Sequence, residues 1–269
     1  MNFHNGTHLL NSKAQIWLWV LSAVILWLAI GLLPRVWLSP PNPPGVENHE
    51  HHHQHHQTVG QELDPATLAK LVADKKESEF NHHLAGLFVA LAGIFMLAQD
   101  VVMKRWPALK YFWPVCFLLA GAFLLVWSDT ELWPFGHRGW LEALENNREV
   151  LQHKIFAALL LALGVIEWRR ARGILDWQWL QWAFPVLAIG GSILLLFHQH
   201  EAGMHGNNHM EVMSRIQSEH LSFSVVGVGI GLSKGLATLK LKTSLHAGFA
   251  KMWPSLMLVL GILLMFYRE

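Results

Sequence analysis

The densest group of side chains that could do chemistry lies between residues 197 and 220, where five histidines and three methionines stand between two apolar runs. Imidazole with thioether sulfur suits Cu(I), and imidazole alone suits Cu(II) or zinc. Methionines at helical spacing are more often packing residues than ligands. The donors are His198, His200, His205, His209 and His220, with Met204, Met210 and Met213. The stretch therefore indicates a transition-metal site, with copper first and zinc second.

Helical phasing separates part of this stretch from the rest. If a helix begins at about His209 and continues into the next apolar run, successive residues turn by about 100°. His209, Met213, Ile216 and His220 then share one narrow stripe. The stripe favours a common pocket for His209, Met213 and His220. The alternative is an amphipathic helix on the bilayer surface, with methionine as ordinary apolar filler.

Composition decides what kind of scaffold holds these donors. The chain has 269 residues, of which 52% are hydrophobic and only 14% charged, whereas ordinary soluble domains carry roughly 25% charged residues. A net charge of +1 gives no basic surface for nucleic acid. The single cysteine, Cys116, cannot build a cysteine-based structural zinc site. We therefore expect an all-α, polytopic membrane helix bundle.

Seven apolar runs predict about seven transmembrane helices, since a span needs about 20 apolar residues. The runs are 16–33, 84–103, 111–127, 155–168, 182–197, 221–239 and 252–267. The first is too long for a signal-peptide core and predicts an uncleaved anchor. The chain then divides into an anchor at 1–38, a Pro/His-rich segment at 39–80 and a six-helix bundle at 81–269. Asp64 and Pro65 predict a short helix through Lys76 within the second part.

The distribution of lysine and arginine orients the bundle. The loops after the second, fourth and sixth runs are basic, which places them and the N-terminus in the cytoplasm and the C-terminus outside. His4, His8 and His246 then lie inside, and the other fifteen of the 18 histidines lie outside. We expect Lys154 and Lys251 to extend their ammonium groups from the span ends to the membrane surface.

Five predicted spans carry a histidine or an aspartate at the outer end. Ionisable groups at a membrane boundary are costly unless they are paired or bind a ligand. Their recurrence predicts a metal site at the outer mouth of the bundle, although each histidine alone could simply face water. Asp129 could equally belong to a turn or a helix cap. The candidate ligands are His82, His83, Asp129, His153, His198, His200, His205, His209, Met213 and His220.

Three further observations limit the function. The tract His49–His56 is typical of unselective metal capture, although it could also be a polar linker. The chain has no P-loop motif. Its GxSxG match at Gly231–Gly235 lies inside the sixth apolar run, and its HExxH match at His49–His53 lies inside the histidine tract, so neither has the structural context that its chemistry needs and no enzyme is expected outside haem-linked redox chemistry. The span centres are almost purely apolar, which weakens both a transport path and a haem in the bundle centre. His153 with His220, or His83 with His198, could still hold haem near the outer surface.

Several short motifs resemble the bacterial copper-resistance protein D (CopD-like) family of inner-membrane proteins. They are the residues at 80–86, 151–154, 166–170, 196–200, 209–210 and 217–220. The resemblance covers residues 80 to 240 and leaves out the His-rich tract. It implies a role in copper uptake or tolerance, with copper handled in the periplasm. It also implies that His83, His153, His198, His200 and His220 are the ligands.

Together these observations predict a multi-pass protein of the bacterial inner membrane that binds copper at its periplasmic mouth and serves copper resistance, homeostasis or import. The expected partners are the lipid bilayer, copper ion and a periplasmic copper-binding protein, without nucleic acid. Two alternatives stay open. One is a membrane redox subunit with haem near its outer face, and the other is a structural membrane subunit.

Overall fold

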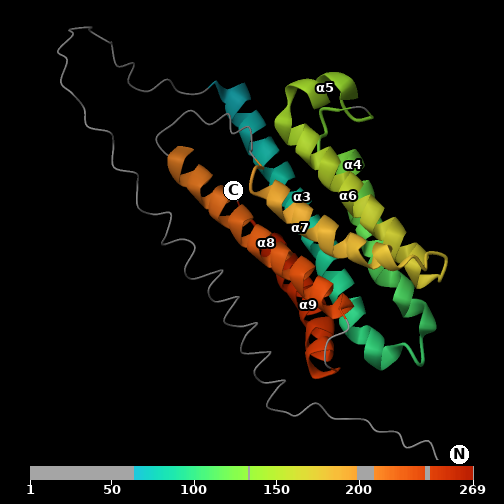
Figure 1. The fold of residues 1–269 in the computed structure, drawn as a ribbon. Coiled ribbons are helices and arrows are strands. Elements are labelled where there is room, and N and C mark those ends of the chain that lie inside the picture. The colour runs from blue at the N-terminus through green and yellow to red at the C-terminus, as the bar shows by residue number, and fades with distance from the viewer. Residues whose placement is uncertain (1–63, 133, 199–208, 240–242, 269) are drawn as a thin grey trace, which may run out of the picture.

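The computed structural model describes residues 64–132, 134–198, 209–239 and 243–268 (Figure 1). These residues are all-α, with one isolated β-bridge between Leu132 and Arg138. The elements are α3 (Pro65–Val102), η1 (Pro107–Tyr111), α4 (Phe112–Trp127), α5 (Trp140–Asn146), α6 (Arg148–Ala171), η2 (Gln178–Trp182), α7 (Ala183–Leu195), α8 (His209–Thr238) and α9 (Thr243–Met265). The predicted anchor at 1–38 and the tract His49–His56 lie outside the described residues.

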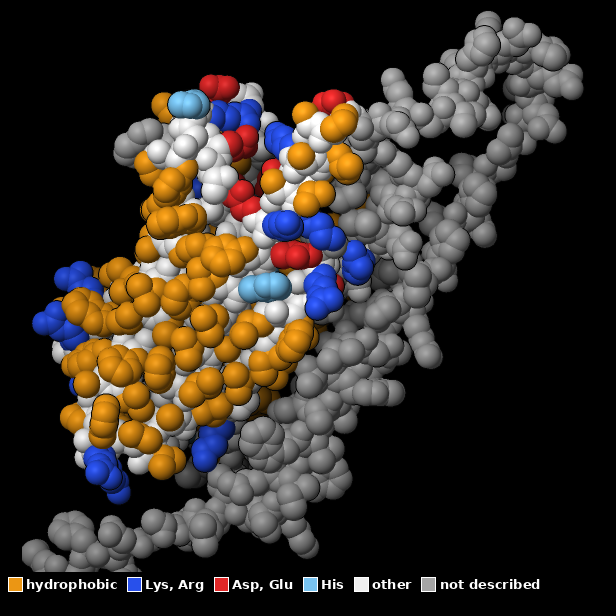
Figure 2. Space-filling view, turned by 180° about the vertical axis from the view of Figure 1, so that it is seen from behind, with side chains coloured by type: hydrophobic (Ala, Val, Ile, Leu, Met, Phe, Trp, Pro, Cys, Tyr) orange, Lys and Arg blue, Asp and Glu red, His pale blue; other side chains and the backbone are white. Residues whose placement is uncertain are grey.

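Six helical segments in the described part of the chain are long and apolar enough to cross a membrane. They are Pro65–Gln99, Pro107–Trp127, Arg148–Ala171, Gln178–Leu195, Met213–Thr238 and Ser244–Met265. On the face that Figure 2 shows, apolar side chains form a broad belt, with charged side chains mostly at its edges. This is the fold of a multi-pass membrane protein, and the six segments match the predicted spans from the second to the seventh.

The short helix expected between Asp64 and Lys76 does not end there. It continues into the next span as α3, a single helix of 38 residues, so the predicted boundary between residues 80 and 81 falls inside one helix. Pro65 occupies the first turn, where proline is tolerated. Neither proline nor glycine follows until Gly86, and the alanine, leucine, lysine and glutamate residues between them favour helix. The predicted end of the helix at Lys76 was therefore wrong, because nothing in the sequence stops the helix there.

Two glycines of α3, Gly86 and Gly93, allow this helix to pack closely against α9. A Cβ atom on Gly86 would lie 2.6 Å from the carbonyl oxygen of Gly261, and one on Gly93 would lie 2.8 Å from the backbone of Pro254 and Leu258. α3 therefore approaches α9 backbone to backbone, as small residues allow in membranes. α3 also packs against α4, while α8 packs against α7 and α9.

α6 and α7 pack against different helices. α6 packs mainly on α4, and α7 packs mainly on α8, with little direct contact between α6 and α7. Four aromatic side chains join α4, α7 and α9 through edge-to-face contacts. They are Trp113, Phe117, Phe184 and Trp253. This group fixes one end of the bundle, and the histidines lie toward the other.

Candidate metal centre

Four histidines from four parts of the chain form a row across one end of the bundle. The ring centroids of His153 and His198 are 5.3 Å apart, those of His198 and His220 are 5.2 Å apart, and those of His220 and His82 are 5.8 Å apart. His153 is on α6, His198 follows α7, His220 is on α8 and His82 is on α3. The structure thus brings together side chains that are up to 138 positions apart in sequence (220 − 82). We call this set the histidine row.

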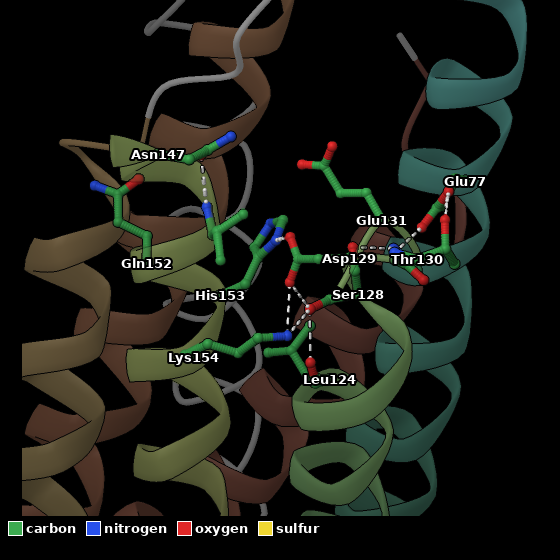
Figure 3. A network of polar contacts seen from close by, with 12 residues as sticks. Glu77, Leu124, Ser128, Asp129, Thr130, Glu131, Asn147, Gln152, His153 and Lys154 are labelled. Carbon is green, nitrogen blue, oxygen red and sulfur yellow. Dashed lines mark hydrogen bonds and ion pairs between the residues drawn. The ribbon is translucent and has the colours of Figure 1, made fainter. Parts of the chain in front are cut away.

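A buried polar network holds the first histidine of the row (Figure 3). Asp129 accepts a hydrogen bond from His153 Nδ1 at 2.9 Å on one oxygen and pairs with Lys154 Nζ at 2.7 Å through the other. Lys154 Nζ also donates to the carbonyl oxygen of Leu125 at 3.0 Å, and Ser128 Oγ donates to Asp129. The expectation that Lys154 reaches out to the membrane surface was wrong. Its ammonium is turned inward because the end of α4 supplies a carboxylate and a carbonyl there.

Asp129 stays ionised in this network. Burial by itself raises the pKa of its carboxyl, but hydrogen bonds from His153, Lys154 and Ser128 and the charge of His153 outweigh burial and lower the pKa to about 2. An ionised carboxylate can only accept hydrogen bonds. The proton between the two side chains is therefore on His153 Nδ1, and in the neutral form of the ring Nε2 is the nitrogen with a lone pair.

His198 has the same tautomer for a different reason. The Gln152 amide donates through Nε2 to the carbonyl oxygen of Phe197 at 2.9 Å, and its Oε1 lies 2.7 Å from His198 Nδ1. Since an amide oxygen is an acceptor, His198 Nδ1 carries the proton and Nε2 has the lone pair. Metal-binding histidines commonly donate their other ring nitrogen in this way to a carboxylate or carbonyl, which fixes the tautomer and the ring orientation.

A carboxylate stands beside these two rings. Potential ligand atoms of Glu149, His153 and His198 all lie within 4.8 Å of one another. Glu149 is in the first turn of α6, four residues before His153, and such a spacing places both side chains on the same face of the helix. Two imidazoles and one carboxylate are a donor set used for zinc and other divalent transition metals.

The chain was compared with models of protein families, with curated proteins and with solved structures. None of them matches. The resemblance to the copper-resistance protein D family therefore stays a prediction.

The remaining predicted ligands are not gathered at this centre in the same way. His83 lies next to the row, but its Nε2 is hydrogen-bonded to the carbonyl oxygen of Tyr267 at 2.9 Å. Met213 is on α8, two helical turns before His220. His200 and His205 lie outside the described residues. His209 begins α8 as the phasing predicted, but its side chain is outside the described part.

At the other end of the row from His153, an aromatic ring holds His82 in place. His82 stacks on Tyr267 with ring centroids 3.9 Å apart and an interplanar angle of 24°, and its Nδ1 donates to the carbonyl oxygen of Ser78 at 2.8 Å. Tyr267 is 1% exposed and also lies 5.9 Å from the ring of His220. The tyrosine therefore fills the space between α3 and α8 where these histidines meet.

Four residues of the site were not among the predicted candidates: Glu149, Gln152, Lys154 and Tyr267. Glu149 was missed because the predicted run begins at residue 155, whereas α6 begins at Arg148; only on that longer helix do Glu149 and His153, four positions apart, share a face. Gln152 and Lys154 flank His153 but point to different neighbours, which depends on where α4 and α7 end. Tyr267 follows the last span and gives no pattern of its own.

Proposed function

We propose that this chain is a bacterial inner-membrane protein that binds copper at Glu149, His153 and His198 and serves copper resistance, homeostasis or import. One observation carries the proposal. Both histidines direct Nδ1 to the side-chain acceptor of a residue from another part of the chain, Asp129 for His153 and Gln152 for His198, an arrangement that is common for imidazoles that bind a metal through Nε2. Glu149 supplies an oxygen donor next to them.

The donor set favours copper in its divalent state. Imidazole nitrogens bind copper and zinc well, and Cu²⁺ leads the order of divalent first-row metals for a given nitrogen and oxygen site. A carboxylate is a poor match for Cu(I), which prefers sulfur. The Cu(I) option raised by the methionines therefore falls behind Cu(II), with zinc second.

The charge distribution supports a periplasmic position for this centre. The opposite end of the bundle carries basic residues at the connection from α3 to α4 and at the end of α6, namely Lys104, Arg105, Lys110, Arg169, Arg170 and Arg172. Positive loops stay in the cytoplasm, so the end with the histidine row would face the periplasm. The N-terminus would be cytoplasmic, with seven spans, and the C-terminus periplasmic.

Copper would come to this centre from the periplasm. The tract His49–His56 would capture the ion, and a periplasmic copper-binding protein would be its donor. No path across the membrane forms part of the proposal, because the interior of the bundle offers few polar groups.

A haem-binding redox subunit is the second candidate. The row itself favours it, because facing histidines from different helices are the usual axial ligands of haem in such bundles. A Soret band in the absorption spectrum of the purified protein would replace the copper proposal with this one.

Copper stoichiometry tests the proposal. In a full-length chain whose tract histidines (49, 51, 52, 53, 55 and 56) are changed to serine, equilibrium dialysis and mass spectrometry should find about one copper per chain. His153→Ala with His198→Ala should remove it, and the exposed His137→Ala at the same end of the bundle should keep it. If the tract substitution alone removes all copper, or if the double variant keeps it, the proposed centre is wrong.

A further inference from the structure

Lys234 lies one helical turn before the end of α8 at Thr238, at the end of the bundle opposite the histidine row. At 1.5 Å per residue it is about 20 Å from His220 along the helix axis. Its ammonium nitrogen is 4.3 Å from the ring centroid of Trp253 and 5.9 Å from that of Phe184, and both rings are buried. An ionisable side chain inside a membrane helix bundle is costly and marks a candidate functional site.

The hydrogen-bond donors of Lys234 are not used by the protein. An ammonium group has three N–H donors, and the faces of two aromatic rings attract its charge. Among the described residues, no oxygen or nitrogen atom accepts a hydrogen bond from it. The side chain is half-buried, so a ligand can still reach the ammonium.

An ion pair on α6 adds a second cation to this place. Glu167 is 4% exposed, and both of its carboxylate oxygens accept from the same nitrogen of Arg170, Nη1, at 2.9 and 3.1 Å. The N–H groups of Arg170 at Nε and Nη2 have no acceptor in the described part of the chain. Lys234 interacts electrostatically with both members of the pair, attractively with Glu167 and repulsively with Arg170. Two cations and one carboxylate therefore leave one positive charge without a counter-charge.

Tryptophans place Lys234 at the depth of lipid headgroups. A Cβ atom on Gly235, the next residue, would lie 3.4 Å from the Trp182 ring. Trp182 and its neighbours Trp177 and Trp179 are all exposed. Exposed tryptophans collect where the hydrocarbon layer meets the headgroups, so the phosphate groups of the bilayer lie at the level of this cluster.

We propose that Lys234 and Arg170 bind the phosphate group of an anionic phospholipid between α6 and α8. Phosphate oxygens are acceptors that match the unused donors of an ammonium and a guanidinium, and basic pockets between transmembrane helices are suited to lipid headgroups. A headgroup with a net negative charge supplies the missing counter-charge, which a zwitterionic headgroup cannot do. Glu149 and His153 lie at the opposite end of the bundle, so lipid binding and copper binding are tested separately.

Substitutions at this end of the bundle separate the ammonium of Lys234 from general positive charge. Lys234→Met removes the ammonium and keeps an unbranched chain against the two rings, and Lys234→Arg keeps the charge. Arg170→Lys keeps a cation beside Glu167 but removes the unused guanidinium donors. Lys251→Met is the matched control, because Lys251 is an exposed lysine of α9 (Thr243–Met265) near the same end.

The probes are phosphatidylglycerol and phosphatidylcholine with the same acyl chains, titrated separately into metal-free full-length protein in detergent and counted by native mass spectrometry. Wild type and Lys251→Met should bind phosphatidylglycerol at least about tenfold more tightly than phosphatidylcholine. Lys234→Met should lose this preference, Arg170→Lys should reduce it, and Lys234→Arg should keep most of it. Thermal midpoints close to that of wild type in lipid-free detergent show that the variants are folded.

Three results would overturn the inference. Wild type could bind the two lipids equally well, a comparison that needs no variant. Lys234→Met and Lys251→Met could weaken the binding of phosphatidylglycerol equally, which would mean that only the general positive charge of this end attracts lipid. Inorganic phosphate could displace phosphatidylglycerol at an equal concentration, which would make free phosphate the ligand in place of the lipid.

Discussion

The two halves of the histidine row are held in different ways. His153 and His198 are fixed by side-chain acceptors, an ionised carboxylate and an amide oxygen. His82 is fixed by a backbone carbonyl and by stacking on Tyr267. The first half also has Glu149 within reach, and the second half has a buried aromatic ring instead.

The difference separates two tasks. A charged acceptor behind an imidazole raises the basicity of the ring and orients its lone pair, which favours metal binding. Stacking and a backbone hydrogen bond fix a ring in place without changing its charge. We therefore assign the metal to the half with Glu149, and structural support to the half with Tyr267.

The largest expected effect comes from breaking the buried ion pair in the first half. Asp129→Leu leaves Lys154, whose side chain is 9% exposed, without its carboxylate, and should destabilise the protein by about 3–5 kcal/mol. Unfolding in mixed detergent micelles measures this. Adding Lys154→Met removes the unpaired charge and should recover most of the loss. A double variant no more stable than the single one would show that the pair is not the cause.

The second effect is on copper affinity. Asp129→Asn keeps the size of the side chain but weakens the acceptor behind His153, and loss of such a partner should lower metal affinity about 10–100-fold. His82→Phe keeps a ring against Tyr267 and is the matched change in the other half. Competition titration with a copper chelator should show no loss for that variant. Equal losses in both halves would contradict the division.

The helices were largely predictable from sequence, because apolar runs bounded by charge leave little choice in a membrane. α8 begins at His209 as the phasing indicated. The length of α3 was missed because the apolar pattern ends near Leu84 although the helix does not, and helix propensity alone carried it outward to Pro65.

The site was predictable in part. The positions of histidines at span ends indicated the face on which they gather. The direction of Lys154 was not predictable, because a lysine at a span end can extend to water or turn inward, and only the end of α4 decides between them. Glu149 looked like one of many acidic residues in an outer loop until His198 was brought next to it.

The third effect concerns pH. The folded pKa of Asp129, about 2, is below the ordinary aspartate value of about 3.9, so its stabilising contribution is present above about pH 4 and disappears as the pH falls through 2. The contribution is of the order of 2 kcal/mol. The free energy of unfolding of wild type should fall by about that much more than that of Asp129→Asn over this range. Parallel curves for the two proteins would contradict the assignment.

The smallest effect belongs to the half with Tyr267. His83→Ala removes the hydrogen bond to the Tyr267 carbonyl and should cost about 1 kcal/mol, with no change in copper affinity. Unfolding and the chelator titration check both statements. A loss of copper in this variant would return His83 to the set of ligands.

The central claim is that His153 and His198 bind one copper ion through nitrogen. Electron paramagnetic resonance of Cu(II) bound to the full-length protein with the tract histidines changed to serine tests it most directly. The account predicts a signal with splitting from two nitrogen ligands, reduced to one nitrogen by His198→Ala and unchanged by His82→Phe. A spectrum that His198→Ala leaves unaltered, or one that only His82→Phe changes, would contradict the account.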